Sequence, residues 1–121
     1  MTGVQTCALP IFPDVFVQNN GVDGHNYLYH NTGHGGFTRV LDSVIVTDTY
    51  VPFKNPSADW GDYDNDGLLD LFVPDDVGGR NHLYHNDGGG RFSNVTAGPM
   101  LTPPPGSGGR AVAWGDYDND G

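Results

Sequence analysis

The sequence predicts an all-β fold, specifically a fragment of a β-propeller built from four-stranded antiparallel blades. First, the 121-residue chain has 19 glycines, nine prolines and no glutamate, so turn formers are common and strong helix formers are scarce. Second, an internal repeat of about 55 residues runs through the chain. Third, each period contains short segments rich in aromatic and β-branched residues, separated by Gly, Asn and Asp, as expected for hairpins.

The repeat is carried by three separate sequence blocks that recur with nearly the same spacing. The paired positions, with separations of 54, 55 and 56 residues, are Trp60 and Trp114, Leu28 and Leu83, and Asp14 and Asp70. Because repeat units of this kind bury their faces only against neighbouring units, we expect adjacent blades of the same chain to be partners in folding.

Four strands are expected in one period, over residues 57–61, 69–73, 81–86 and 91–95. This division predicts a partial blade with strands two to four over residues 12–50 and a complete blade over 51–106. Residues 107–121 then hold the first strand and a truncated metal loop of the next blade.

Residues 1–11 differ from the rest of the chain. They resemble the translation of a short-read sequencing adapter, and as a secretory signal they lack a basic segment and carry an interrupting Pro10. We therefore expect the native protein to start near Phe12, the alternative being a disordered native segment. Cys7 is then not native, so no thiol chemistry is expected from it.

The candidate metal site is an aspartate-rich loop in which carboxylates occupy positions 1, 3, 5 and 9. Gly67 at position 6 permits a sharp turn, and the carbonyl at position 7 adds a further oxygen. Six or seven oxygen ligands suit Ca²⁺, whereas the absence of a soft ligand in the loop disfavours zinc and copper. The predicted ligands are Asp62, Asp64, Asp66, the carbonyl oxygen of Leu68 and Asp70, with Asp116, Asp118 and Asp120 in the second copy.

Two other structures also place aspartates close together in a loop. An EF-hand needs a glutamate at position 12 and flanking helices, but position 12 is Val73 within a predicted strand, which excludes it. A simple solvated turn would explain the polarity. It would not explain the fixed spacing of the aspartates or their recurrence one period later.

The remaining polar and aromatic residues favour structural roles. His30 and His85 are repeat equivalents at a Tyr-His-Asn strand end, and Trp60 and Trp114 recur with the period, which predicts packing. The sequon that starts at Asn94 is expected to lie on a strand. Since the sequence holds no nucleophile motif, we do not expect an enzyme.

These residues give the chain a resemblance to the FG-GAP/VCBS repeat family, whose calcium-loop blades form integrin-α-like propellers. The combination AWGDYDNDG-x-LDLFV and N-x-LYHN-x-G-x-x-F is most similar to bacterial relatives of cartilage acidic protein, a group that often carries an ASPIC/UnbV domain. The resemblance implies calcium roles for the aspartates named above. It also implies a seven-bladed, exported protein that is secreted or held at the cell surface.

The expected function is binding or adhesion, with an extracellular protein or carbohydrate as ligand and calcium holding the hairpins rigid. A net charge of −10 argues against nucleic acid, and no apolar stretch is long enough for membrane insertion. Two alternatives stay open: an accessory propeller of a secreted polysaccharide hydrolase or lyase, and a purely structural stalk.

Overall fold

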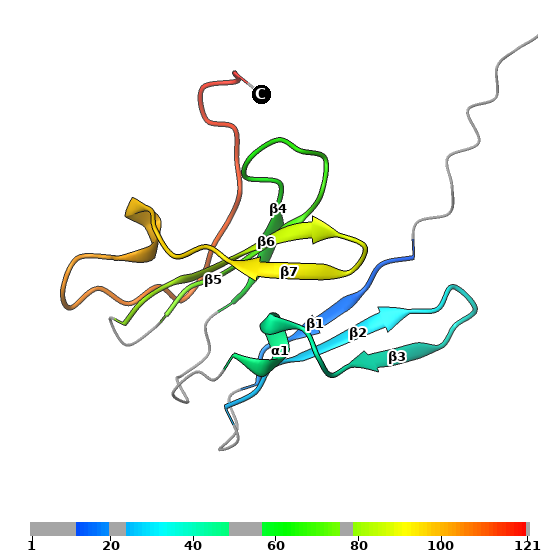
Figure 1. Ribbon diagram of the computed structural model, residues 1–121. Coiled ribbons are helices and arrows are strands. Elements are labelled where there is room, and N and C mark those ends of the chain that lie inside the picture. Colours follow the sequence, from blue (N-terminus) through cyan, green and yellow to red (C-terminus); the bar gives the residue numbers. More distant parts are fainter. Residues whose placement is uncertain (1–11, 20–23, 49–56, 76–78, 121) are drawn as a thin grey trace, which may run out of the picture.

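The structure is a computed structural model that describes residues 12–19, 24–48, 57–75 and 79–120. These residues form two antiparallel sheets in which hydrogen-bonded neighbours are consecutive along the chain, β1-β2-β3 and β4-β5-β6-β7 (Figure 1). The strands are β1 Val15–Val17, β2 Tyr27–Asn31, β3 Phe37–Val40, β4 Asp59–Gly61, β5 Asp70–Val73, β6 His82–Gly88 and β7 Arg91–Asn94. The predicted all-β fold is therefore confirmed.

The four-stranded sheet lies where the sequence places four strands in one period, and each predicted strand overlaps one observed strand. β6 extends beyond its predicted end to Gly88, where the β6–β7 register shifts between Asn86 and Gly88. Gly88 has a φ of 79°, a backbone conformation that glycine adopts without a steric cost. The irregularity therefore occurs where the sequence allows it.

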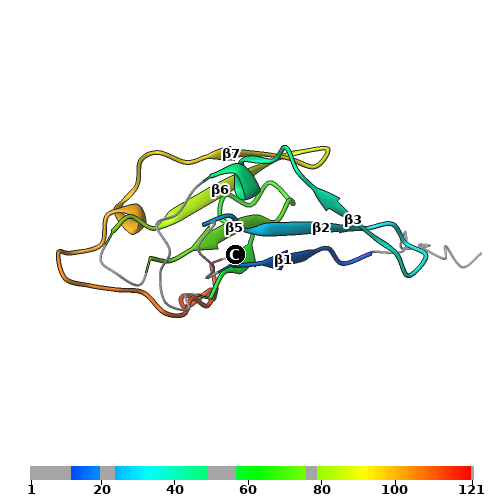
Figure 2. The same cartoon turned by 90° about the horizontal axis from the view of Figure 1, so that it is seen from below.

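Two short helical turns were not predicted. α1 covers Val44–Thr47 and η1 covers Pro99–Leu101, so the two turns occupy equivalent places in successive repeats. The β-branched sequence of α1 favours a strand, but Ile45 is fully buried and Val46 is 7% exposed. α1 packs against β2 and β7 and lies between the two sheets (Figure 2). Burial therefore outweighs local propensity here.

The strand predicted after residue 106 is wrong for the described residues, because none of residues 102–120 is in a strand. Single backbone hydrogen bonds do join this segment to residues that flank β4 and β5, from Gly109 N to Asp75 O and from Ser57 N to Arg110 O. A strand needs a ladder of hydrogen bonds to a neighbouring strand, and these two isolated bonds do not form one. The segment therefore stays irregular.

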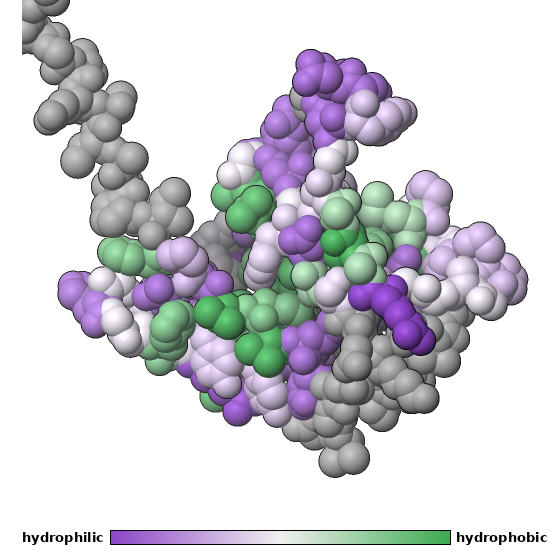
Figure 3. Space-filling model, turned by 180° about the vertical axis from the view of Figure 1, so that it is seen from behind, coloured by the Kyte–Doolittle hydropathy of each residue, from purple (hydrophilic) through white to green (hydrophobic). Residues whose placement is uncertain are grey.

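One hydrophobic core joins the two sheets. Its buried members are Leu28, Ile45, Val46, Leu71, Val73 and Tyr84. Tyr84 is completely buried, and its hydroxyl donates a 3.0 Å hydrogen bond to Asp48 Oδ2 just after α1. Hydrophobic residues gather over the middle of one face, whereas the projecting C-terminal loop is hydrophilic (Figure 3). In the described residues no helix has the length and apolar character needed to cross a bilayer.

Candidate metal centre

The loop between β4 and β5 is held in shape by its first aspartate. The Asp62 carboxylate accepts hydrogen bonds from the backbone N–H of Asp66 at 3.1 Å and of Gly67 at 2.8 Å. Asn65 and Gly67 have φ values of 60° and 89°, conformations that asparagine and glycine tolerate best. The loop sequence therefore suits a tight turn with its carboxylates close together.

Three carboxylates converge in this loop. One oxygen from each of Asp62, Asp64 and Asp66 lies within 4.8 Å of the others. Three like charges at this separation repel one another, and an all-oxygen donor set is the kind that Ca²⁺ prefers. The residues present therefore fit a hard divalent cation. The carbonyl of Leu68 stays a prediction as a further ligand.

The second copy of the loop has the same geometry. One oxygen from each of Asp116, Asp118 and Asp120 again lies within 4.8 Å of the others, and Asp116 accepts a hydrogen bond from Asp120 N at 3.1 Å. Asn119 has a φ of 59°, matching Asn65. Because separate copies of one sequence adopt one shape, the local sequence sets the loop conformation.

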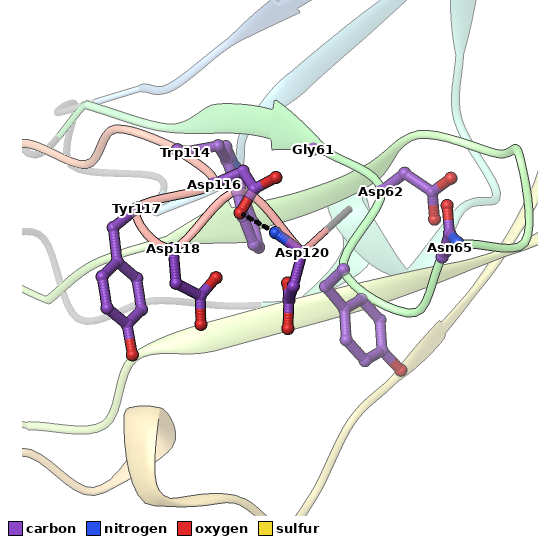
Figure 4. A pocket seen from close by; sticks show the side chains of 10 residues that line it. Gly61, Asp62, Asn65, Trp114, Asp116, Tyr117, Asp118 and Asp120 are labelled. Atoms are coloured by element: carbon purple, nitrogen blue, oxygen red, sulfur yellow. Dashed lines mark hydrogen bonds between the residues drawn. The ribbon is translucent and has the colours of Figure 1, made fainter.

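An open pocket of about 590 Å³ lies between the two loops. Asp62 and Asn65 line it from the first loop, and Asp116, Asp118 and Asp120 line it from the second (Figure 4). Asp118 and Asp120 project in the same direction from the second loop. The pocket is therefore strongly acidic.

Asp70, the ninth loop residue, lies at the start of β5 and is completely buried, whereas Asp62 is half-buried and Asp64 and Asp66 are exposed. Its two carboxylate oxygens accept hydrogen bonds from the backbone N–H of Asn86 at 2.7 Å and of Tyr63 at 3.1 Å. Asp70 therefore links the loop to β6, which is a structural role in addition to any metal role.

His85, for which the sequence favours a structural role, lies beside two of the loop carboxylates. Its Nδ1 atom lies 3.2 Å from Asp70 Oδ1 and 3.4 Å from Asp64 Oδ2. The antiparallel pairing of β5 with β6, Leu71 with Tyr84 and Phe72 with Leu83, continues to place Asp70 opposite His85. The available signal was that an Asp and a His recur together, since His30 Nδ1 lies 3.0 Å from Asp14 Oδ1 in the first repeat.

The asparagine after each of these histidines explains the rest of the recurring motif. Asn86 donates from Nδ2 to Leu69 O at 2.9 Å and accepts from Gly88 N at 3.0 Å. Asn31 makes the same two bonds in the first repeat, to Pro13 O at 3.1 Å and from Gly33 N at 3.0 Å. Each asparagine therefore connects the turn that follows it to a residue shortly before the neighbouring strand, β5 in the second repeat and β1 in the first.

The negative charge of the site affects the hydroxyl pKa of Tyr63, a residue of the loop. Burial raises the pKa of its hydroxyl above the ordinary value, and the neighbouring carboxylates of Asp64, Asp70 and Asp66 raise it further. Its ring lies edge-on to His85, with centroids 6.0 Å apart and planes at 84°. The Tyr63 hydroxyl is therefore neutral at physiological pH, and its ring lies at the edge of the site.

The aromatic and sequon residues lie where packing roles require them. Trp60 contacts Phe16 and Phe92, with ring centroids 6.4 and 6.0 Å apart. Asn94 ends β7, and its side chain donates to Asp48 Oδ2 at 3.3 Å. The predicted packing role of Trp60 and the strand position of Asn94 are confirmed.

Comparison with known proteins places this architecture in a family. The chain is 31% identical over 110 residues to cartilage acidic protein 1 of Mus musculus, an alignment that covers 88% of this chain and 16% of the relative. For the Homo sapiens protein of the same name the values are 30% identity over 110 residues, 88% and 15%. The chain therefore spans less than a fifth of the length of these relatives. No solved structure gives a significant match.

A sequence profile described as an FG-GAP-like repeat matches residues 12–73 and 62–121. The overlapping matches include both sheets and both aspartate loops. Such repeats imply that the two antiparallel sheets are part of a β-propeller, and the predicted resemblance to FG-GAP repeats and cartilage acidic proteins is confirmed. The chain belongs to the FG-GAP-like repeat family.

Proposed function

We propose that this chain is a calcium-stabilised segment of an exported propeller that acts in binding or adhesion. The observation that carries the proposal is the convergence of three carboxylates in the Asp62 loop, repeated in the Asp116 loop. A charged cluster that recurs with the same shape supports a cation role more strongly than a single acidic turn does.

Calcium would act on folding rather than on a reaction. The Asp62 loop joins β4 to β5, and Asp70 at its end is hydrogen-bonded to β6. A bound divalent cation supplies positive charge that offsets the repulsion among the carboxylates. The hairpin would then be rigid from β4 through β6, and the rims of the loops would have a defined shape.

A non-catalytic role agrees with how the histidines are used in the described residues. His30 lies beside Asp14 and His82 beside Asp48, and both carboxylates also accept hydrogen bonds that hold the fold together. The ligand we propose is an extracellular protein or carbohydrate that contacts the loop rims. The relatives named for cartilage support an extracellular location.

The test is a calcium titration of the 121-residue chain, followed by thermal unfolding with and without calcium. A ligand present at about 100 times its dissociation constant stabilises the folded state by about 2.7 kcal/mol, so the unfolding temperature should rise. The double variant Asp66→Asn/Asp120→Asn should lose this rise, because each loop loses a carboxylate. Asp42→Asn, an exposed position outside both loops, is the matched control and should retain it.

The proposal fails if calcium leaves the unfolding temperature of the parent chain unchanged. It fails equally if the double variant responds to calcium as strongly as the control does, since the loops would then not be the binding site.

A further inference from the structure

A second pocket, of about 260 Å³, is lined by residues at the end of β3, just before β2 and in α1. Its polar lining consists of His25, Asn26, Arg39 and Thr47. None of the described residues that line it is acidic, although the chain has a net charge of −10. Small-molecule sites are commonly pockets of about 300–1,000 Å³ with a few well-placed polar groups. This pocket therefore suits a small ligand.

Two buried nitrogen atoms in this pocket have no hydrogen-bond partner among the described residues. They are Nδ2 of Asn26, a residue that is 2% exposed, and Nδ1 of His25. The amide oxygen of Asn26 accepts a hydrogen bond from Asn19 N at 3.2 Å, which fixes the orientation of the side chain. A buried N–H without an acceptor is costly, so an oxygen atom is needed beside Nδ2.

Asn81 in the second repeat shows which kind of atom belongs beside this nitrogen. Asn81 is the repeat equivalent of Asn26, and its amide oxygen likewise accepts a backbone hydrogen bond, from Asp75 N at 2.9 Å. Its Nδ2 donates to Met100 O, a carbonyl of η1, at 2.7 Å. In the first repeat α1 takes the place of η1, and no described carbonyl accepts from Nδ2 of Asn26.

His25 differs from its repeat equivalent in the same way. The equivalent residue is Arg80, whose guanidinium donates to Thr96 O, just after β7. The equivalent of Thr96 is Leu41, which lines the pocket without accepting from His25 Nδ1. The second repeat therefore satisfies both positions with its own carbonyl oxygens, whereas the first repeat leaves space for two oxygen atoms of a ligand.

We propose that this pocket binds an acidic sugar, a ligand that combines a carboxylate with hydroxyl groups. Its two carboxylate oxygens take the places that carbonyl oxygens occupy in the second repeat, beside His25 and Asn26. Arg39 adds positive charge, and its guanidinium is positioned by a contact of 4.5 Å with the centroid of the Tyr27 ring. The pocket uses no residue of either aspartate loop, so this function goes beyond the proposed calcium role.

The hydroxyl group of Thr47 favours a sugar over an acidic protein side chain. Thr47 Oγ1 donates its proton to Ser43 O at 3.2 Å, so its lone pairs remain to accept a hydrogen bond from a ligand. A sugar hydroxyl can donate that bond, whereas an ionised aspartate or glutamate side chain only accepts. Val40 and Leu41 provide apolar surface for the C–H groups of the sugar ring.

The first experiment follows the side-chain amide resonances of the 121-residue chain by ¹⁵N NMR during a titration with glucuronate. The Asn26 amide should shift until binding saturates, whereas the Asn81 amide, which already bonds to Met100 O, should not move. Glucose, which lacks the carboxylate, should bind about tenfold more weakly, because hydrogen bonds to charged groups are the stronger ones. N-acetylglutamate, which lacks the hydroxyl groups, should bind about fivefold more weakly.

The second experiment compares two arginine variants. Arg39→Gln should weaken glucuronate binding by about tenfold or more, because a charged donor is lost. Arg91→Gln removes the same charge outside the pocket and should bind as the parent does. Both arginines are exposed, so both variants should fold. The readout is the Asn26 amide and not the calcium-dependent unfolding temperature, so failure of this proposal and failure of the calcium proposal are distinguishable.

Three outcomes would overturn the proposal. If glucuronate leaves the Asn26 amide unmoved, the pocket holds only water. If N-acetylglutamate binds as tightly as glucuronate, the pocket recognises an acidic protein group and not a sugar. If Arg39→Gln and Arg91→Gln weaken binding equally, the overall charge of the chain controls binding and the pocket does not.

Discussion

The indole ring of Trp114 lies edge-on to the ring of Phe72, with centroids 6.4 Å apart and planes at 83°. Trp60 and Phe16 make the same contact one repeat earlier, at 6.4 Å and 85°. In each case the tryptophan belongs to the repeat that follows the phenylalanine. This aromatic contact therefore links consecutive repeats, and it recurs with the period of the sequence.

The ring contact between Phe16 and Trp60 should stabilise the fold by more than the burial of its apolar surface contributes. Edge-to-face aromatic pairs contribute about 0.5–1.5 kcal/mol in double-mutant cycles. We expect that coupling from urea unfolding of Phe16→Ala, Trp60→Ala and the double variant. Phe37→Ala combined with Trp60→Ala is the control, because Phe37 is 51% exposed and should not couple. Additive effects of Phe16 and Trp60 would show that the contact is incidental.

Gly61 should be required for the corresponding aromatic contact of the next repeat, the one that Trp114 makes with Phe72. A side-chain carbon at Gly61 would overlap the Trp114 ring, whereas one at its repeat equivalent, Gly115, would meet no atom within 4 Å. In a Trp60→Phe background, Gly61→Ala should therefore shift Trp114 fluorescence to longer wavelength as the ring moves into water. Gly115→Ala should leave the spectrum unchanged. Identical spectra for the two variants would show that Trp114 does not pack on Gly61 in solution.

The strands could be predicted from the sequence, whereas α1 and His85 could not. Strand segments such as Asp70–Val73 are marked by apolar residues between turn formers, a signal that is local. Ile45 and Val46 form a helical turn only because both sheets bury them, and no local pattern reveals that. The position of His85 depends on the register of β5 with β6, which sequence spacing alone does not define. The loop aspartates were predictable because their spacing is itself the geometric rule.

Asp70→Asn should destabilise the fold even in the presence of a chelator, when no metal contributes. The buried carboxylate accepts from Asn86 N and Tyr63 N, but an asparagine amide would turn one NH₂ group toward one of those donors. Leaving such a buried donor unsatisfied costs about 1–3 kcal/mol in the free energy of unfolding, which urea denaturation measures.

The matched control for this change is Asp14→Asn. Asp14 accepts from Asn31 N in the same way, at 2.8 Å, but its side chain is 45% exposed, so water can replace a lost bond. We expect a smaller loss of stability there. Equal losses at Asp14 and Asp70 would contradict a role for burial in the difference.

His82 should make the fold sensitive to acid. Burial lowers the pKa of its imidazole below 6.5, and Arg80 lowers it further, although the carboxylates of Asp48 and Asp75 oppose the shift. The folded state therefore favours neutral His82, and below about pH 6.5 the unfolded chain binds this proton more readily. The free energy of unfolding should fall as the pH drops from about 7.5 to about 5.5, because the stability present above the unfolded pKa is lost.

The measurement is urea denaturation across that range, in chelator, for the parent, His82→Gln and His34→Gln. His82→Gln has no imidazole to protonate, so its stability should fall less with acid than that of the parent. His34 is exposed, and His34→Gln should keep the response of the parent. If His82→Gln loses stability with acid as steeply as the parent does, another group controls the response. The contact of His82 with Asp48 Oδ2 at 3.6 Å would then act as a favourable ion pair on protonation.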